Sequence, residues 1–296
     1  MATAPTTSNA DPKQLVAMAI GSVSSIATLP EVTARIVKTV EDPRSNAQQL
    51  HQIVSHDPAL VTRILKVVNS AFYGLPGQIA SIERAIVMLG LNAIKNIAVA
   101  ASLGQLFRGV KLCEGYTAKD LWTHCVGVAV VARELARQAK LSIADEAFLA
   151  GMIHDVGLLV SLQVWPEKLK RACEEVRKTG ADFCETERTI IGVDHQQLGQ
   201  ALAEKWSFPR SCQLVTGFHH EPSLVAEGNK PLVSLVALAD RICADAQHGF
   251  PLTRPHNEDG TEVSSLAEMA GVPVSVVDNV RTNIATILGN AASMLA

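Results

Sequence analysis

Apolar residues recur at intervals of three and four along most of the chain, which is the pattern of amphipathic α-helices. Asp57 is a suitable N-cap and Pro58 a suitable first residue for one of these helices, and Ser81 is a suitable N-cap for the next. Gly90 predicts a break before a further helix. No strand pattern competes with the helical period, so the sequence predicts an all-α protein.

A polar stretch, RGVKLCEGYTAKD at residues 108–120, interrupts the helical pattern and is the predicted boundary between two lobes. The expected organisation is a flexible tail at 1–12, an N-terminal helical lobe at 13–110, a second helical lobe at 115–247 and C-terminal helices at 261–296. Within the second lobe we predict helices at 119–139, 144–154, 167–179, 183–191, 195–205, 209–219 and 231–247. Residues 248–260 show no apolar period, and Gly271–Pro273 predicts a break that divides the last segment into two helices.

Composition narrows the class of protein. A chain of 296 residues with 48% hydrophobic residues can bury a large core, and the aromatic content of only 4% favours close-packed helices. The net charge of −3 offers no basic footprint for a phosphate backbone, so nucleic acid is not an expected partner. The six cysteines form no CxxC pair and are expected to be reduced. The start of the chain has no secretory signal pattern, and no run approaches the ~18 apolar residues of a membrane span, so we expect a cytoplasmic protein without a membrane segment.

Side chains that bind metals are concentrated in the predicted second lobe. Asp155 directly follows His154, and Asp240 interrupts an apolar helical segment, where an unpaired carboxylate is costly to bury. Imidazole and carboxylate together suit Zn, Mn or Fe, or a pair of such ions. The residues with this chemistry are His124, His154, Asp155, His195, His219, His220 and Asp240.

Each of these residues also has a purely structural interpretation. His124 is compatible with a satisfied core histidine, and His195 with a neighbour of a helix cap. His219 and His220 would complement the dipole at a helix C-terminus, and Asp240 would satisfy a loop backbone. The occurrence of all of them in one lobe favours a shared metal site over separate structural roles.

The order of His124, then His154 and Asp155, then Asp240 resembles the H…HD…D signature of the HD superfamily of metal-dependent phosphohydrolases. The chain resembles one branch more closely, the HDOD (HD-related output domain) family, over about residues 26–222. The similar segments are LPEVTARIVKTVEDP, HDPALVTRILKVVNSAFYG, IASIERAIVMLGLNAIKNI, GMIHDVGLL, DHQQLGQALAEKWSFP and GFHHEP. The resemblance implies a two-lobed helical fold and a regulatory or output role in bacterial signalling.

The histidines downstream of Asp155 are also similar to those of HD-GYP phosphodiesterases, which implies that a pair of metal ions can bind. Asp120 lies four residues before His124 and is a candidate for an additional carboxylate, where those enzymes often carry Glu. In an enzyme of this kind, Asp155 would bridge the ions and a metal-bound hydroxide would attack phosphorus.

Two departures from the HD-GYP pattern weaken the enzyme interpretation. Leu158 stands where the HDxGK element ends in Lys, a point charge suited to a phosphate oxygen. The GYP segment is missing after Glu221. Hydrolysis of cyclic di-GMP is therefore not expected.

We accordingly expect a regulatory protein with an HD-type metal site and little or no hydrolase activity. No receiver, kinase or DNA-binding domain is recognisable, so the output would travel through a signalling protein partner. The alternatives are a metal-dependent phosphohydrolase or phosphodiesterase, and a module that binds a nucleotide without turning it over. The C-terminal helices either pack on the second lobe or mediate formation of a homo-oligomer.

A turn-rich stretch of the first lobe carries Phe72, Tyr73 and Leu75. Large apolar side chains in a turn either fill a core or form a docking surface. We expect them to fill the core.

Overall fold

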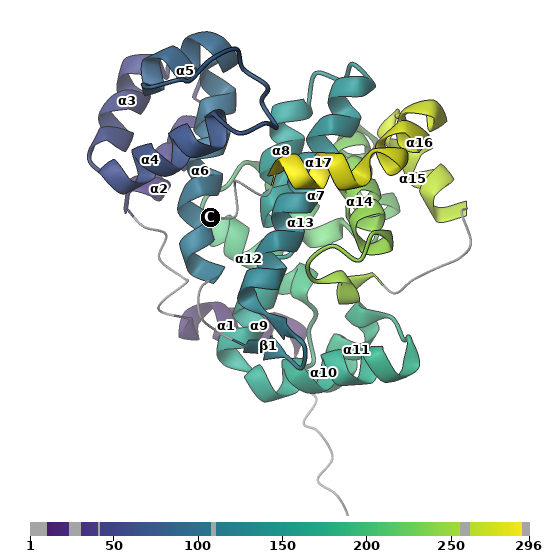
Figure 1. The fold of residues 1–296 in the computed structure, drawn as a ribbon. Helices are drawn as coiled ribbons and strands as arrows, with labels where there is room; N and C mark the ends of the chain where they lie inside the picture. The colour runs from purple at the N-terminus through teal and green to yellow at the C-terminus, as the bar shows by residue number, and fades with distance from the viewer. Residues whose placement is uncertain (1–10, 24–30, 41, 108–110, 255–260, 292–296) are drawn as a thin grey trace, which may run out of the picture.

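The computed structural model describes residues 11–23, 31–40, 42–107, 111–254 and 261–291, and these are mostly helical (Figure 1). The all-α prediction is therefore confirmed, and the helices form two lobes with C-terminal helices packed on the second. The predicted tail at 1–12 lies mostly outside the described residues.

The first lobe is built from short helices. Asp57 caps one of them by accepting a hydrogen bond from the Leu60 amide at 2.9 Å, and the Ser81 hydroxyl accepts one from the Arg84 amide at 3.2 Å. Gly90 has a φ of +88°, which favours glycine, and separates the last two helices. The helices are α2 (Glu31–Val40), α3 (Ala47–Ser55), α4 (Pro58–Val68), α5 (Ile82–Leu89) and α6 (Leu91–Leu103), followed by a 3₁₀ turn at Gly104–Phe107.

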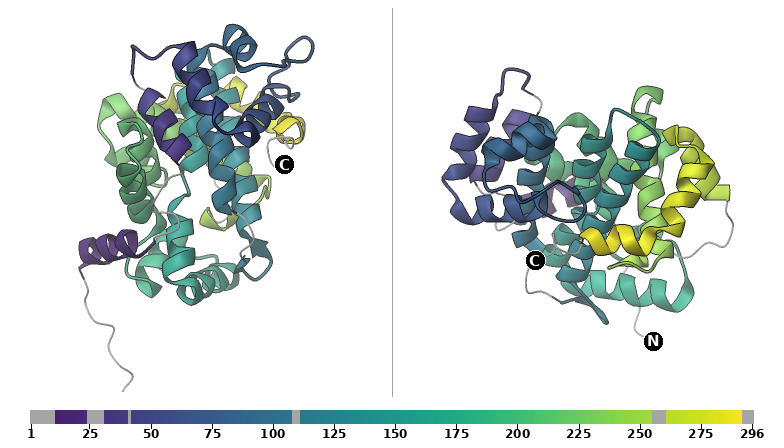
Figure 2. Two further views of the ribbon diagram at one scale, coloured as in Figure 1. Left: turned by 90° about the vertical axis from the view of Figure 1, so that its left-hand side faces the viewer. Right: turned by 45° about the horizontal axis from the view of Figure 1, so that its top comes forward.

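The second lobe is arranged around its longest helix, α7, which packs against α8 and α14 (Figure 2). Its helices are α7 (Ala118–Gln138), α8 (Ala144–Ile153), α9 (Gly157–Val164), α10 (Pro166–Thr179), α11 (Phe183–Ile190), α12 (His195–Lys205), α13 (Arg210–Phe218) and α14 (Lys230–Asp245). Short 3₁₀ turns lie at Pro222–Leu224, Glu227–Asn229 and Pro251–Thr253. The bounds of the seven predicted helices agree with the structure to within two residues, whereas α9 was not predicted.

The expectation that no strand is present is wrong at the boundary between the lobes. There, β1 (Lys111–Cys113) and β2 (Tyr116–Thr117) pair antiparallel. Gly115, with a φ of +83°, allows the chain to reverse between them. Strands this short carry too few residues to show an alternating pattern.

The C-terminal segment contains three helices rather than the expected two. They are α15 (Thr261–Ala270), α16 (Val274–Thr282) and α17 (Ile284–Ala291). The expected break at Gly271–Pro273 is present, and Asn283 forms a second one between α16 and α17. Because α15 packs on α14, and α16 and α17 on α7, these helices cover the second lobe.

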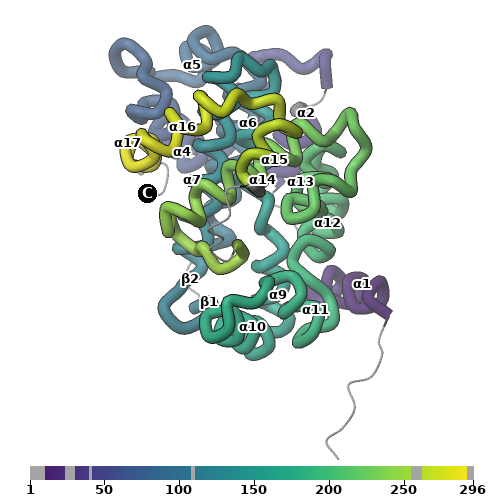
Figure 3. The backbone as a smooth tube through the Cα atoms, turned by 90° about the vertical axis from the view of Figure 1, so that its right-hand side faces the viewer, coloured from purple at the N-terminus to yellow at the C-terminus, as the bar shows by residue number. Residues whose placement is uncertain are grey.

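The N-terminal helix α1 (Pro12–Ser22) belongs in space to the second lobe, although its residues fall within the range assigned to the first. It packs against α9 and α12 (Figure 3). The Lys205 ammonium donates a hydrogen bond to the Ile20 carbonyl at 3.0 Å across this contact. The described part of the chain therefore crosses from the second lobe to the first and back.

The aromatic turn of the first lobe fills the junction between the lobes, as expected. The Phe72 ring stacks on Phe148 of α8 at a centroid distance of 6.4 Å. The Arg133 guanidinium of α7 lies 4.9 Å from the Tyr73 ring centroid, a cation–π distance. The turn thus fixes the first lobe against α7 and α8.

One stretch of the described residues, Ala144–Val164, is long and apolar enough to span a membrane, with a mean hydropathy of 1.6. This differs from the expectation that no such run exists. Because 89% of the stretch is buried inside the protein, it is a core element made of α8 and α9. His154 and Asp155 lie at its centre.

Candidate metal centre

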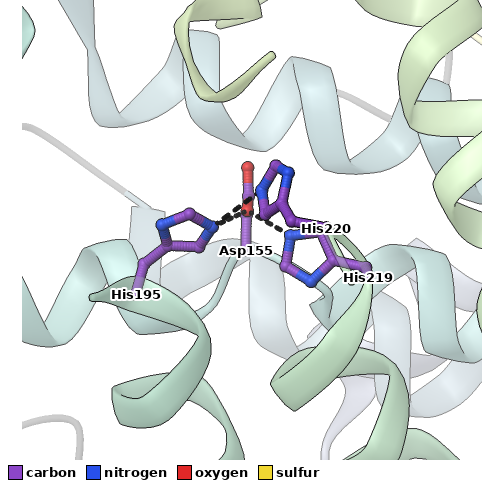
Figure 4. Close-up of side chains that lie close together, drawn as sticks. All are labelled: Asp155, His195, His219 and His220. Carbon is purple, nitrogen blue, oxygen red and sulfur yellow. Dashed lines mark hydrogen bonds and ion pairs between the residues drawn. The ribbon is translucent and has the colours of Figure 1, made fainter. Parts of the chain in front are cut away.

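The predicted metal-binding residues come from separate elements and converge in the core of the second lobe. Figure 4 shows those around Asp155. Most of these side chains are fully buried, and His220 is half-buried. They are His124 of α7, His154 and Asp155 between α8 and α9, His195 at the start of α12, His219 and His220 after α13, and Asp240 of α14.

Close packing of α9 against α12 makes this convergence possible. A Cβ on Gly157 would lie 1.9 Å from the His195 carbonyl oxygen, which is far inside a van der Waals contact. Only glycine at this position lets the chain after Asp155 approach the start of α12. Gly157, the glycine of the HDxG sequence, therefore allows the close contact between α9 and α12 that brings Asp155 and His195 together.

One group of ligand atoms surrounds one oxygen of Asp155. The Oδ2 atom lies 3.4 Å from His154 Nε2 and 3.9 Å from His124 Nε2. Asp240 Oδ1 lies 3.0 Å from His124 Nε2 and 4.0 Å from His154 Nε2. Separations of this size are those between neighbouring ligands of one metal ion bound at about 2.0–2.2 Å.

A second group surrounds the other oxygen of Asp155. The Oδ1 atom lies 3.4 Å from His195 Nε2 and 3.3 Å from His219 Nε2. His220 Nε2 lies 3.1 Å from His195 Nε2 and completes the group. Because both groups share Asp155, its carboxylate is placed to bridge two ions.

Hydrogen bonds to the Nδ1 atoms turn the histidine Nε2 atoms toward the centre. His154 Nδ1 lies 2.7 Å from the Gly151 carbonyl, and His219 Nδ1 lies 3.1 Å from the Val215 carbonyl. His195 Nδ1 lies 2.5 Å from Glu187 Oε2. An Nδ1 atom that donates to an oxygen leaves the Nε2 lone pair free for a metal, as is usual for metal-binding histidines.

Several buried atoms at the centre have no hydrogen-bond partner among the described residues. They are both carboxylate oxygens of Asp155 and the Nε2 atoms of His154 and His219. Unpaired buried carboxylate oxygens are costly, and a cation between them and the imidazoles would satisfy all of these atoms. The residues present therefore fit one or two divalent ions.

The carboxylates are held in the ionised form that metal binding needs. Burial opposes ionisation of Asp155, but the neighbouring His154 holds its pKa well below the usual range. Burial likewise opposes ionisation of Asp240, and the Arg254 guanidinium holds its pKa well below the usual range. Arg254 Nε donates to Asp240 Oδ2 at 2.6 Å, which leaves Oδ1 facing the centre.

The histidines differ in their proton affinity. Burial lowers the pKa of His219 to about 4 and that of His220 well below its usual range, so both are neutral near pH 7. Burial also opposes protonation of His195, but the Glu187 carboxylate raises the pKa of this residue to about 9. A cation bound beside Asp155 would repel that proton.

Asp120, the candidate for an additional carboxylate, lies outside the cluster. Its Oδ2 atom accepts hydrogen bonds from the Thr117 amide and the Thr117 hydroxyl, both at 2.7 Å. The two residues form a capping box at the start of α7. The four-residue spacing to His124 is present, but the cap directs the Asp120 carboxylate away from the cluster.

Sequence reasoning missed two residues that support the centre. Glu187 accepts from both the amide and Nδ1 of His195, and Arg254 binds Asp240. Glu187 lies four residues after Phe183, on the buried face of α11, so a charge on an apolar face was an available signal. Arg254 lies in the segment without periodicity and gave no such signal.

Residues 26–222 match the family model of the HDOD domain. The chain belongs to the HDOD domain family. Asp240, Arg254 and the C-terminal helices lie beyond the matched residues, so part of this HDOD protein's centre is built outside them.

Solved structures have the same fold. An HDOD domain protein of unknown function from Geobacter sulfurreducens is 22% identical, with a TM-score of 0.83 over 96% of this chain and 98% of that one. A proposed phosphohydrolase from Shewanella amazonensis SB2B is 24% identical, with a TM-score of 0.75 over 95% and 97%. A proposed signal transduction protein from Marinobacter aquaeolei VT8 is 21% identical, with a TM-score of 0.75 over 97% and 66%.

A relative from Treponema pallidum (strain Nichols), described as an uncharacterized protein, is 28% identical over 229 residues. The match covers 77% of this chain and 44% of the relative, so the chain spans less than half of that protein's length.

Proposed function

We propose that this HDOD protein is a cytoplasmic regulatory module that holds a pair of divalent metal ions and acts through contacts with a signalling protein partner. In this proposal it has little or no hydrolase activity. The observation that carries the metal part is the Asp155 carboxylate, which is buried between two groups of imidazole nitrogens and has no hydrogen-bond partner in the described part of the chain.

The residues have distinct parts in such a centre. Asp155 would contribute to holding both ions, and His124, His154 and Asp240 would hold the ion on one side of the centre. The other side consists of His195, His219 and His220. Nitrogen and carboxylate donors suit Fe, Mn or Zn. When bound, such a pair supplies positive charge that neutralises the buried carboxylates and polarises an oxygen ligand.

The regulatory part of the proposal has separate support. Leu158, which replaces the lysine of the HDxGK element, is fully buried and offers no charge to a phosphate. The fold is also that of the Marinobacter protein, which is described as a proposed signal transduction protein. A role in signalling needs a partner, because the ligand side chains other than His220 are fully buried.

A second candidate function is that of a metal-dependent phosphohydrolase. The observation that favours it is a cavity of about 380 Å³ that reaches His220 and Arg254 beside a full ligand set. The Shewanella protein with this fold is described as a proposed phosphohydrolase. In this alternative, Asp155 and the imidazoles would hold the ions and the cavity would admit a phosphate ester.

Metal analysis of purified protein tests the shared centre. We expect close to two equivalents of Fe, Mn or Zn per chain after reconstitution, and a loss of most of this metal in Asp155→Asn. Asp145→Asn is the matched control, because Asp145 lies on α8 but pairs with Arg133 instead. Folded wild-type protein that takes up no metal would overturn the proposal.

Activity and partner binding distinguish the two functions. A panel of phosphomonoesters, nucleotides and cyclic dinucleotides is assayed with the metal-loaded protein. Turnover that Asp155→Asn abolishes, while the fold stays intact, would favour the phosphohydrolase. A partner that co-purifies with wild-type protein but not with Asp155→Asn, in the absence of turnover, would favour the regulatory module.

A further inference from the structure

The cavity beside the metal centre is closed on one side by a C-terminal helix. Its walls include His220 and Glu221 after α13, Arg254, and Glu262, Ser265 and Leu266 of α15. His220 belongs to the second ligand group, so the cavity lies next to the centre.

Arg254 connects the centre to this wall through three of its nitrogens. Its Nε donates to Asp240 Oδ2 at 2.6 Å, and its Nη2 donates to the His219 carbonyl at 2.6 Å. Its Nη1 donates to Glu262 Oε1 at 2.5 Å. The side chain is only 7% exposed, so the guanidinium is held rigidly between two residues of the centre and α15.

Glu262 lies between two arginines. Its Oε1 atom binds Arg254, and its Oε2 atom lies 3.3 Å from Nη1 of Arg241 on α14. A glutamate in the first turn of α15 also favours the helix dipole, but that effect needs no contact with a buried guanidinium. The contact instead places a carboxylate on the Nη1 nitrogen of Arg254, a residue that lines the cavity.

A planar guanidinium next to metal ions is the kind of group that proteins use to bind phosphate. Here that group is already occupied by an anion of the chain itself. Glu221 and Glu262 both line the cavity beside the Arg254 guanidinium, so an anion that enters competes with the Glu262 carboxylate for that guanidinium.

We propose that Glu262 is an internal substitute for a phosphate-type oxyanion: it occupies Nη1 of Arg254 at the wall of the cavity, and its displacement frees a phosphate-binding site formed by Arg254 beside His220. This inference rests on the proposed metal centre, which would supply further positive charge at the same place. It gives α15 a regulatory role, because movement of this helix would withdraw Glu262 from Arg254.

Phosphate binding to the full-length, metal-loaded protein tests the proposal. Isothermal titration with inorganic phosphate is carried out on wild type, on Glu262→Gln, and on Glu134→Gln as a control. Glu134 is a comparable glutamate that pairs with Arg137 at the far end of α7, away from the cavity. We expect phosphate to bind Glu262→Gln about 10- to 100-fold more tightly than wild type, and Glu134→Gln to behave as wild type.

Further measurements test whether the gain in affinity depends on Arg254 and whether it is specific to phosphate. Adding Arg254→Lys to Glu262→Gln should remove most of the gain, because lysine cannot keep the contacts to Asp240 and the His219 carbonyl and also offer a donor at the position of Nη1. Acetate in place of phosphate should show a much smaller gain. An equal gain for acetate would overturn the assignment to a phosphate-type ligand. Folded Glu262→Gln with the phosphate affinity of wild type would overturn the proposal as a whole.

Two measurements distinguish failure of this inference from absence of the proposed metal centre. Metal content is measured on the same samples, and the titration is repeated on metal-free protein, where release of Arg254 alone should still give a smaller gain. Absence of metal would overturn the proposed function, whereas absence of any gain would overturn this inference. If Glu262→Gln does not fold, Glu262→Asp takes its place, since a carboxylate shortened by one methylene should release Arg254 in part.

Discussion

The two lobes differ in what they bury. The core of the first lobe consists of aliphatic side chains such as Leu60, Ile64 and Ile94. Lys95 is a buried cationic residue of this lobe and contacts the Ser45 hydroxyl. The core of the second lobe buries a connected group of histidines and carboxylates around Asp155. Aliphatic burial stabilises the first lobe without a ligand, whereas the second lobe buries charge that a cation would neutralise.

The two lobes are therefore expected to be stabilised by different interactions. Coulombic attraction to a metal would hold together α7, α8, α12, α13 and α14, which contribute the ligands. The first lobe contributes none of them and contacts the second lobe through α6 and the aromatic turn. Its stability should therefore be insensitive to metal, and that of the second lobe should depend on it.

The largest expected effect is that of metal removal. Chelation should lower the melting temperature by roughly 5–15 °C, because a ligand bound at 100 to 1,000 times its Kd adds about 3–4 kcal/mol to a domain of this size. Thermal unfolding monitored by circular dichroism, with and without chelator, measures the change. Addition of Mn, Fe or Zn should restore the original value. If protein shown to contain metal has the same melting temperature with and without chelator, the second lobe does not depend on metal for its stability, and the expected difference between the lobes is wrong.

A cavity in the first lobe should have a comparable effect that is independent of metal. Leu60 of α4 is fully buried, and Leu60→Ala should lower the free energy of unfolding by about 2–5 kcal/mol in both the metal-free and the metal-loaded protein. Urea unfolding measures it. Val87→Ala, at a side chain that is 73% exposed on α5, is the control and should change stability by less than about 0.5 kcal/mol. Loss of metal from Leu60→Ala would show that the lobes are coupled.

The buried lysine of the first lobe should destabilise it slightly at neutral pH. Burial lowers the pKa of Lys95, so the folded protein binds this proton more weakly than the unfolded chain does. Stability from this group therefore rises as the pH increases through the folded pKa toward the unfolded value. Lys95→Met should be neutral or stabilising by about 1 kcal/mol at pH 7, and this advantage should shrink toward pH 10. A strongly destabilised variant would show that the contact with Ser45 outweighs the cost of burial.

Local patterns predicted most of the fold. The Asp57 and Ser81 caps were visible because a cap and its helix are neighbours in sequence. The hairpin around Gly115 was missed because strands of two and three residues have no measurable period. The position of α1 was not predictable either, since its contacts with α9 and α12 join residues far apart in the chain.

In the candidate site, too, residues adjacent in the sequence were predictable, whereas a contact between residues far apart in the chain was not. The HD motif, with its adjacent His154 and Asp155, indicated the chemistry, and the structure brings the other suggested ligands except Asp120 to it. Arg254 was missed because a loop residue that contacts Asp240 leaves no pattern in the sequence. Whether metal binds stays a prediction.

The smallest expected effect concerns Asp120, where sequence spacing and geometry disagree. Because its carboxylate accepts from the Thr117 amide and hydroxyl, Asp120→Ala should cost about 0.5–1 kcal/mol, as is usual for loss of a helix cap, and leave the metal content unchanged. Asp120→Asn keeps an acceptor oxygen and should retain most of the wild-type stability. Urea unfolding and metal analysis of both variants measure this. A loss of metal in either variant would return Asp120 to the ligand set, and would mean that the capping box opens when the second lobe binds its ions.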